Sequence, residues 1–198
     1  MPYFGFDDLV GVETDRIYLK ILFSRYEKSG RVVRLKRGMY VAKEYLDNLE
    51  KKGRLSAYLE LISNILYEPC YLSLDYVLYK HNLLTEIPIN FTLISTRKTK
   101  TFANVLGRFF YHKTKKELFR GFTATHKEGD FMILEATKAK ALFDFLYFRK
   151  NFLSGKESVE ELRLNLADFT AKDKAELLSY AKTEKTKKMK VIINHLFT

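Results

Sequence analysis

Basic side chains surround a glycine turn near the N-terminus, and the chemistry they can do is phosphate binding. Lys36 and Arg37 stand at the tip of two short β-prone runs, and Gly38 can supply the positive φ of a hairpin turn. Arg31 and Arg34 flank this tip. Ammonium and guanidinium groups pair with phosphate oxygens, so such a hairpin is typical of contact with a nucleic-acid backbone.

A helix is expected directly before this hairpin. Thr14 is a good N-cap, and Gly30 is a good C-terminal stop after Ser29. Apolar residues recur with helical spacing at Leu19, Leu22, Phe23 and Tyr26. The pattern predicts a helix with one buried stripe, followed by a basic hairpin, which is the outline of a winged helix.

The opposite side of that helix carries the candidate reading residues. Arg16 and Lys20 lie near its N-terminus and could enter a major groove. Ile17 and Ile21 share this side, where water is a poor neighbour for them. A short helical piece is expected before this helix, at residues 6–11, and we expect the two isoleucines to pack on it or on a partner subunit.

A second concentration of positive charge follows in residues 97–128, with nine Lys and Arg against two Asp and Glu. Its candidate phosphate ligands are Arg97, Lys98, Lys100, Arg108 and Lys113. Two interpretations are open, a second phosphate-binding surface or ordinary solvated lysines on strands and turns.

A metal-dependent nuclease is the enzymatic alternative. Asp130, Glu135 and Lys138 resemble the Asp and Glu-x-Lys set of restriction endonucleases. Glu and Lys three positions apart point to opposite faces of a strand, however, so the spacing argues against this. The single cysteine and scattered histidines indicate no metal site, and we expect no enzyme activity and no cofactor.

Composition is that of a folded protein. The 198 residues are 46% hydrophobic and carry a formal net charge of +11. Apolar runs are too short to cross a bilayer, and no basic-then-apolar leader is present, so we expect a soluble cytoplasmic protein without membrane contact.

The hydrophobic period changes along the chain. It is helical over 43–83, alternates from Ile89, and becomes helical again after Glu135. Further strands are expected at 105–112, 121–125 and 130–134, and closing helices at 158–166, 171–182 and 185–197. We predict an α+β fold, with a winged helix-turn-helix DNA-binding domain at 1–50 and a small mixed α/β domain with closing C-terminal helices at 51–198.

Several short motifs, in order, resemble those of the AbiEi-type antitoxins, a family of winged-helix transcriptional regulators. They are Gly30–Val41, Pro69–Leu78, Phe91–Arg97, Gly107–Tyr111, Leu118–Gly121 and Ala136–Tyr147. The chain departs from the family where Lys138-Ala139 replaces a Pro-Glu pair. Lys140 and Asp144 remain in that motif, at a helical i, i+4 spacing where an ion pair on the exposed edge would contribute about 0.2–0.5 kcal/mol.

The resemblance implies an antitoxin of a type IV toxin–antitoxin system. Such a protein represses its own promoter and counteracts a nucleotidyltransferase-like toxin without forming a stable complex with it. The second domain, including Lys140 and Asp144, would then serve neutralisation. The expected partner is double-stranded promoter DNA with inverted repeats, bound by a homodimer or by two monomers. A nucleic-acid-binding interaction module without antitoxin activity is a further alternative.

Overall fold

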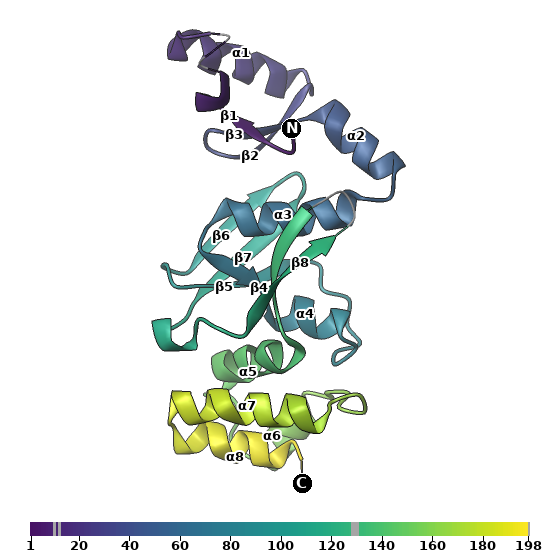
Figure 1. Ribbon diagram of the computed structural model, residues 1–198, viewed down its shortest axis with the longest axis vertical. Helices are drawn as coiled ribbons and strands as arrows, with labels where there is room; N and C mark the ends of the chain where they lie inside the picture. The colour runs from purple at the N-terminus through teal and green to yellow at the C-terminus, as the bar shows by residue number, and fades with distance from the viewer. Residues whose placement is uncertain (10, 12, 128–130, 198) are drawn as a thin grey trace.

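The computed structural model describes residues 1–9, 11, 13–127 and 131–197. Helices and sheets alternate along one long axis, with the N-terminal elements at one end and the last helices at the other (Figure 1). The predicted α+β class is confirmed. None of the helices in the described ranges is long and apolar enough to cross a lipid bilayer.

The first 51 residues form what we call the N-terminal unit. Its elements are β1 (Phe4–Gly5), the 3₁₀ helix η1 (Asp7–Leu9), α1 (Arg16–Lys28), β2 (Val32–Lys36), β3 (Met39–Ala42) and α2 (Lys43–Lys51). The three strands form one antiparallel sheet in the order β1-β3-β2. The predicted hairpin is confirmed, and Gly38 makes its turn at φ 78°.

Helix α1 forms where the sequence predicts it, but Thr14 is not its cap. Asp15 is the N-cap, and its Oδ1 accepts from the backbone N–H groups of Ile17 at 2.7 Å and Tyr18 at 3.2 Å. The carboxylate satisfies two donors that the first helical turn would otherwise leave unpaired. Gly30 follows the helix at φ 71°, as its C-terminal stop requires.

The sheet of the N-terminal unit is covered on both faces. On one face, α1 packs into a small core made by Leu19, Phe23, Val32 and Tyr40. On the other face, Leu35 and Val41 belong to the main core that continues into the rest of the chain. The predicted division near residue 50 falls at the turn between α2 and the next helix, and apolar packing crosses it.

The remaining chain, residues 52–197, is called the second unit. Its first part contains α3 (Leu55–Leu66), β4 (Cys70–Leu72), α4 (Leu74–Lys80), β5 (Phe91–Ser95), β6 (Lys100–Asn104), β7 (Gly107–Lys113), η2 (Lys116–Leu118), β8 (Phe122–Lys127), β9 (Phe131–Ala136) and α5 (Lys138–Arg149). The described strands form a mixed sheet in the order β6-β7-β5-β4-β9-β8. Strands β4 and β6 were not predicted from the sequence.

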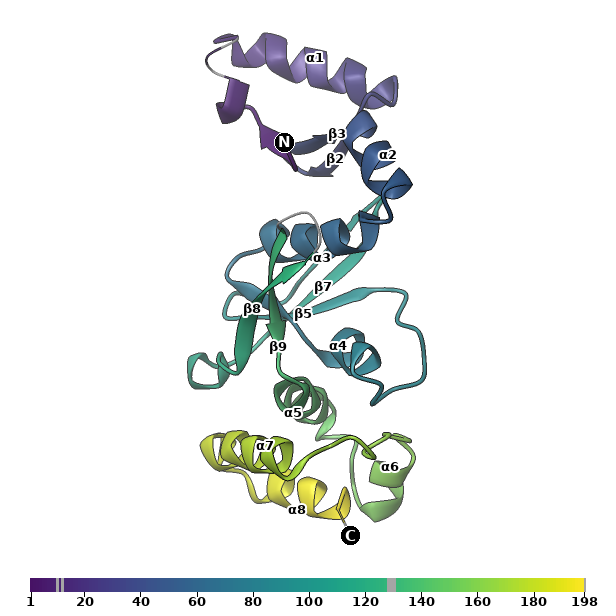
Figure 2. The same cartoon turned by 45° about the vertical axis from the view of Figure 1, so that its right-hand side comes forward.

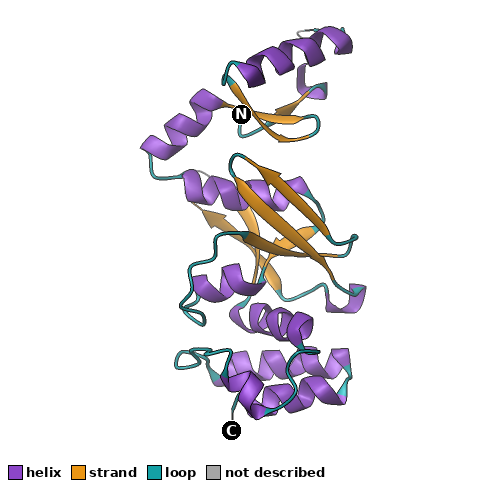
Figure 3. Cartoon of the chain, turned by 180° about the vertical axis from the view of Figure 1, so that it is seen from behind, coloured by secondary structure: helices purple, strands orange, loops and turns teal. Residues whose placement is uncertain are grey.

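Helices cover both faces of this sheet (Figures 2 and 3). On the α3 side, the Tyr111 hydroxyl of β7 donates to the Ser63 carbonyl at 2.6 Å. Cys70 of β4 is also buried there, and its thiol donates to the Asn64 carbonyl at 3.1 Å. Helices α4 and α5 lie on the opposite face.

Three further helices pack beyond α5. They are α6 (Lys156–Glu160), α7 (Ala171–Glu184) and α8 (Lys187–His195). The predicted closing helices are therefore present, although α6 is shorter and earlier than the predicted 158–166. Thr170 and Thr186 cap α7 and α8 by accepting from Asp173 N and Met189 N.

Candidate nucleic-acid interface

The outward face of α1 is the first part of the candidate interface. This helix lies at the end of the molecule (Figure 1). Its buried residues Leu19 and Phe23 pack against Val32 and Tyr40 of the small sheet. Lys20 is exposed on the other side. Arg16 is exposed as well, but its Nη2 lies 2.6 Å from Asp7 Oδ1 of η1, so part of its charge is compensated.

No residue that the structure describes buries the two isoleucines of this face. Ile17 is 70% exposed and Ile21 is 48% exposed. The prediction that they pack on the first helical piece is therefore wrong, because η1 leaves them open to solvent.

The basic hairpin supplies the second part. Arg31, Arg34 and Arg37 are exposed, and the Arg31 guanidinium lies 5.5 Å from the centre of the Tyr26 ring. These three side chains remain available to an anionic partner at the edge of the small sheet. Their exposure is compatible with the predicted phosphate contacts, which stay a prediction.

Lys36 differs from its neighbours at the hairpin tip. Its Nζ donates to the carbonyls of Leu66 at 3.0 Å and Ile65 at 3.5 Å, at the C-terminal end of α3. Burial lowers the pKa of Lys36, and the nearby Arg97 and Lys100 charges act in the same direction. The prediction of Lys36 as a free phosphate ligand is corrected, because its ammonium group fastens the hairpin to the second unit.

An irregularity in the pairing of β2 with β3 explains why the Lys36 side chain points toward α3. The pairing of β2 with β3 shifts between Arg34 and Lys36. Strict alternation would place both side chains on one face of the sheet. With the shift, Arg34 is exposed while Lys36 reaches α3.

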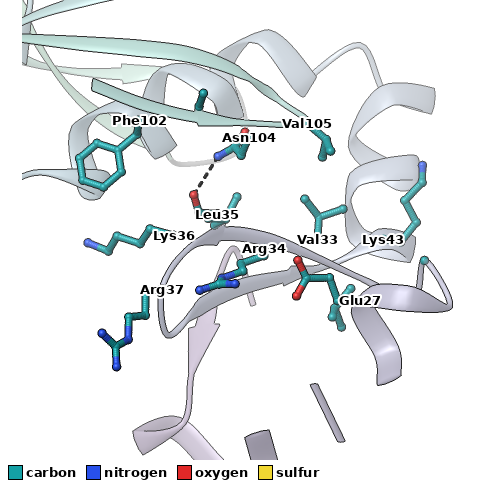
Figure 4. Close-up of a pocket in the computed structure, with 13 residues that line it drawn as sticks. Glu27, Val33, Arg34, Leu35, Lys36, Arg37, Lys43, Phe102, Asn104 and Val105 are labelled. Carbon is teal, nitrogen blue, oxygen red and sulfur yellow. Dashed lines mark hydrogen bonds between the residues drawn. The ribbon is translucent and has the colours of Figure 1, made fainter. Parts of the chain in front are cut away.

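A groove of about 590 Å³ separates this hairpin from the edge strand β6 (Figure 4). Strand β2 is an edge of the small sheet, and β6 is an edge of the large one. Asn104 spans the gap by donating from Nδ2 to the Leu35 carbonyl at 2.9 Å. Arg34, Arg37 and Lys43 line the groove, which makes its wall basic.

The second basic zone meets the hairpin on the α3 side of the large sheet. Arg97 stacks on Tyr67 at 4.5 Å and donates to the Glu68 carbonyl at 3.1 Å. The Lys100 ammonium lies 4.6 Å from the centre of the Phe102 ring. Lys98 is exposed next to them. Aromatic rings under cations fix their positions without removing their charge.

One residue of the predicted second surface, Arg108, lies elsewhere. Arg108 pairs with Ala103 in the β6–β7 register, whereas Lys100 pairs with Tyr111. Paired residues share a face, and faces alternate along a strand, so Arg108 and Lys100 point to opposite sides. Lys113 lies two residues after Tyr111, so it shares the side of Lys100, and it is exposed at the end of β7. The five predicted residues therefore do not form one surface.

Lys140 and Asp144 form the predicted i, i+4 pair, with Nζ 2.6 Å from Oδ1. Their predicted position on an exposed edge is wrong, because both side chains are 0% exposed. The Tyr71 and Ser73 hydroxyls donate to Asp144 Oδ2 at 3.1 and 2.8 Å. Burial raises the pKa of Asp144, and the charge of Lys140 with these two donors opposes that rise. These residues lie in the interior and offer no surface to a partner.

The two described residues of the nuclease alternative, Glu135 and Lys138, have different charge partners. Asp130 lies outside the described residues. Glu135 pairs with Lys80 of α4, whereas Lys138 contacts Asp173 of α7 at 3.0 Å. Among the described side chains, no group of three or more His, Cys, Asp and Glu is arranged to hold a metal ion.

The sequence did not reveal a charged cluster between α3, α4 and β9. Glu60 Oε1 accepts from the Tyr76 hydroxyl and from Lys80 Nζ, both at 2.9 Å, and Lys80 also pairs with Glu135. Only Tyr76 and Lys80 are close in the chain, four apart on α4, whereas Glu60 and Glu135 are distant from them and from each other, so no local spacing predicts the cluster. The cluster connects α3, on one face of the large sheet, with α4, on the other face, next to β9.

No protein-family model matches the chain, and no curated protein matches its sequence. The resemblance to AbiEi-type antitoxins therefore stays a prediction.

Proposed function

We propose that the chain binds duplex DNA through α1 and the β2–β3 hairpin and acts as a transcriptional regulator. The observation that carries this proposal is the outward face of α1, set on a β1-β3-β2 sheet whose hairpin exposes Arg34 and Arg37. A helix fits the major groove while a basic hairpin follows the backbone beside it. This arrangement supports a winged helix-turn-helix.

The proposed DNA is the promoter of the protein's own gene, with inverted repeats bound by a homodimer or by two monomers, and the proposed site of action is the cytoplasm. The antitoxin role, against a nucleotidyltransferase-like toxin and without a stable complex, rests on the sequence motifs of the second unit. Co-expression with the protein of the adjacent reading frame tests it. Growth arrest that the full chain does not relieve would refute that role.

The hairpin gives the sharpest test of DNA binding. Arg37→Ala should weaken binding to the gene's upstream region and lower the slope of log affinity against log salt by about 0.9 for each phosphate that the protein no longer neutralises. Lys36→Ala should change that slope less, because its ammonium group is engaged by α3 carbonyls. Fluorescence anisotropy over a salt series measures both.

The matched control is Lys172→Ala, which removes an exposed cation from α7 at the far end of the molecule. Its affinity and slope should equal those of the parent protein. A folded Arg37→Ala protein that is indistinguishable from Lys172→Ala would refute the role of the hairpin.

A further inference from the structure

The N-terminal half of the outward line of α1 is apolar where a solvent-facing helix would be polar. Ile17 and Ile21 are one turn apart, and Ser24 and Lys28 continue the same line at the positions i+7 and i+11. All four side chains are exposed. Single exposed apolar residues need no explanation, but two in register on an unpartnered helix mark a contact surface.

The charges around this line show what kind of partner fits. Lys20 lies on one side of it and Arg25 on the other, and both are exposed; Glu27, two turns after Lys20 on its side, is the exposed acidic neighbour. The line itself ends in Lys28 and contains no acidic residue. An apolar strip between cations is complementary to a polyanion that presents apolar groups in a groove between two rows of negative charge.

Duplex DNA has this chemistry. The 5-methyl group of thymine is the apolar group in the major groove, and the phosphates run along both rims. Residues four apart on a helix are separated by about 6 Å along its axis, and two base-pair steps span about 6.8 Å. Two isoleucines at this spacing match thymines two steps apart.

We propose that Ile17 and Ile21 recognise thymine methyl groups, so that the preferred DNA site carries thymines at a two-step spacing. This inference rests on the proposed DNA binding and adds the base that is read. Lys20, Arg25 and Lys28 would hold the helix to the phosphate rims, and the isoleucines would supply discrimination.

The test isolates the methyl group. Short duplexes of random sequence are enriched by binding to the full chain, and the best site is resynthesised with deoxyuridine replacing thymidine at one position at a time. This replacement removes only the 5-methyl group. At the two positions that face Ile17 and Ile21, the parent protein should lose about fourfold in affinity for each methyl group removed.

Ile17→Ala and Ile21→Ala should each lose this sensitivity at one position while keeping the fold, because both side chains are exposed and alanine favours helices. Ile87→Ala and Ile89→Ala are the matched controls. These isoleucines are also strongly exposed, but they lie between α4 and β5 in the second unit. Both control proteins should retain the full response to deoxyuridine.

Failure of the inference and failure of DNA binding give different results. If no duplex is enriched or bound, the proposed function is refuted, and the inference with it. If duplexes bind but thymine and deoxyuridine sites bind equally, DNA binding stands and methyl recognition is refuted. If Ile17→Ala instead abolishes self-association in sedimentation experiments, with no methyl dependence, the strip joins two copies of the chain and the inference is overturned.

Discussion

Two lysine–aspartate pairs with the same spacing lie in very different parts of the molecule. Lys43 and Asp47 pair at the start of α2, where their side chains remain 50% and 43% exposed. Lys140 and Asp144 pair near the start of α5, where neither side chain has any exposure. Residues four apart meet on a helix whatever surrounds them, so the spacing predicts both contacts equally well.

The surroundings decide what each pair contributes. Glu-Tyr-Leu separates the exposed pair, and Ala-Leu-Phe separates the buried one. Water solvates each exposed charge without its partner, so the pair in α2 contributes little. Inside the protein a charge that loses its partner stays desolvated and uncompensated. A charge reversal at Lys140 is therefore expected to destabilise the second unit.

Removal of one buried charge should have the largest effect. Asp144→Ala should lower the free energy of unfolding by about 3–5 kcal/mol, because Lys140 would remain buried without its counter-charge. Urea unfolding followed by circular dichroism measures this. Asp47→Ala is the matched control in α2 and should leave the urea midpoint unchanged. Equal midpoints for the two variants would show that burial does not distinguish the pairs.

A smaller effect is expected from crowding the buried pair. Gly121 has φ 80°, and a Cβ there would lie 2.0 Å from the Tyr180 hydroxyl oxygen and 3.2 Å from Lys140 Cβ. Gly38 has φ 78° and no atom within 4 Å of such a Cβ. Gly121→Ala should therefore cost about 1–3 kcal/mol more than Gly38→Ala, which carries only the backbone strain. Thermal and urea unfolding of both variants would reveal this difference, and equal losses would mean that the Lys140 surroundings are loosely packed.

The smallest effect belongs to the exposed pair. Lys43→Ala should leave the urea midpoint within error of the parent protein at both low and high salt, because solvent screens the pair at the surface of α2. The double variant with Asp47→Ala should behave in the same way. A loss of stability of the same size at low and at high salt would place this pair in the same class as Lys140 and Asp144, because salt does not screen a buried pair.

Local signals predicted α1 and the β2–β3 hairpin, although they did not predict β1. Gly30 and Gly38 require positive φ, and Leu19 and Phe23 mark a buried stripe, so α1 and the hairpin follow from neighbouring residues alone. The start of α7 at Ala171 was predicted for the same reason. Strands β4 and β6 have three and five residues and carry no clear alternation of their own, so partner strands distant in sequence define them.

The sequence predicted the residues of the candidate interface only where neighbouring residues determine their exposure. Arg34 and Arg37 are exposed on the hairpin as expected. Lys36 was assigned to DNA because its contacts with the α3 carbonyls depend on a register shift and on packing between units. The burial of Lys140 could have been inferred from the sequence, because its neighbours Ala139, Ala141, Leu142 and Phe143 are all apolar. The structure buries all four of them.

The burial of Cys70 makes its modification rate a measure of transient opening in the second unit. Burial raises the pKa of this thiol to about 12, so the reactive thiolate is almost absent at neutral pH. Cys70 is the single cysteine of the chain and lies in the central strand β4. Alkylating reagents and peroxides should therefore modify the protein only during transient opening around β4. The rate of that reaction would count how often the centre of the second unit opens, with no added label.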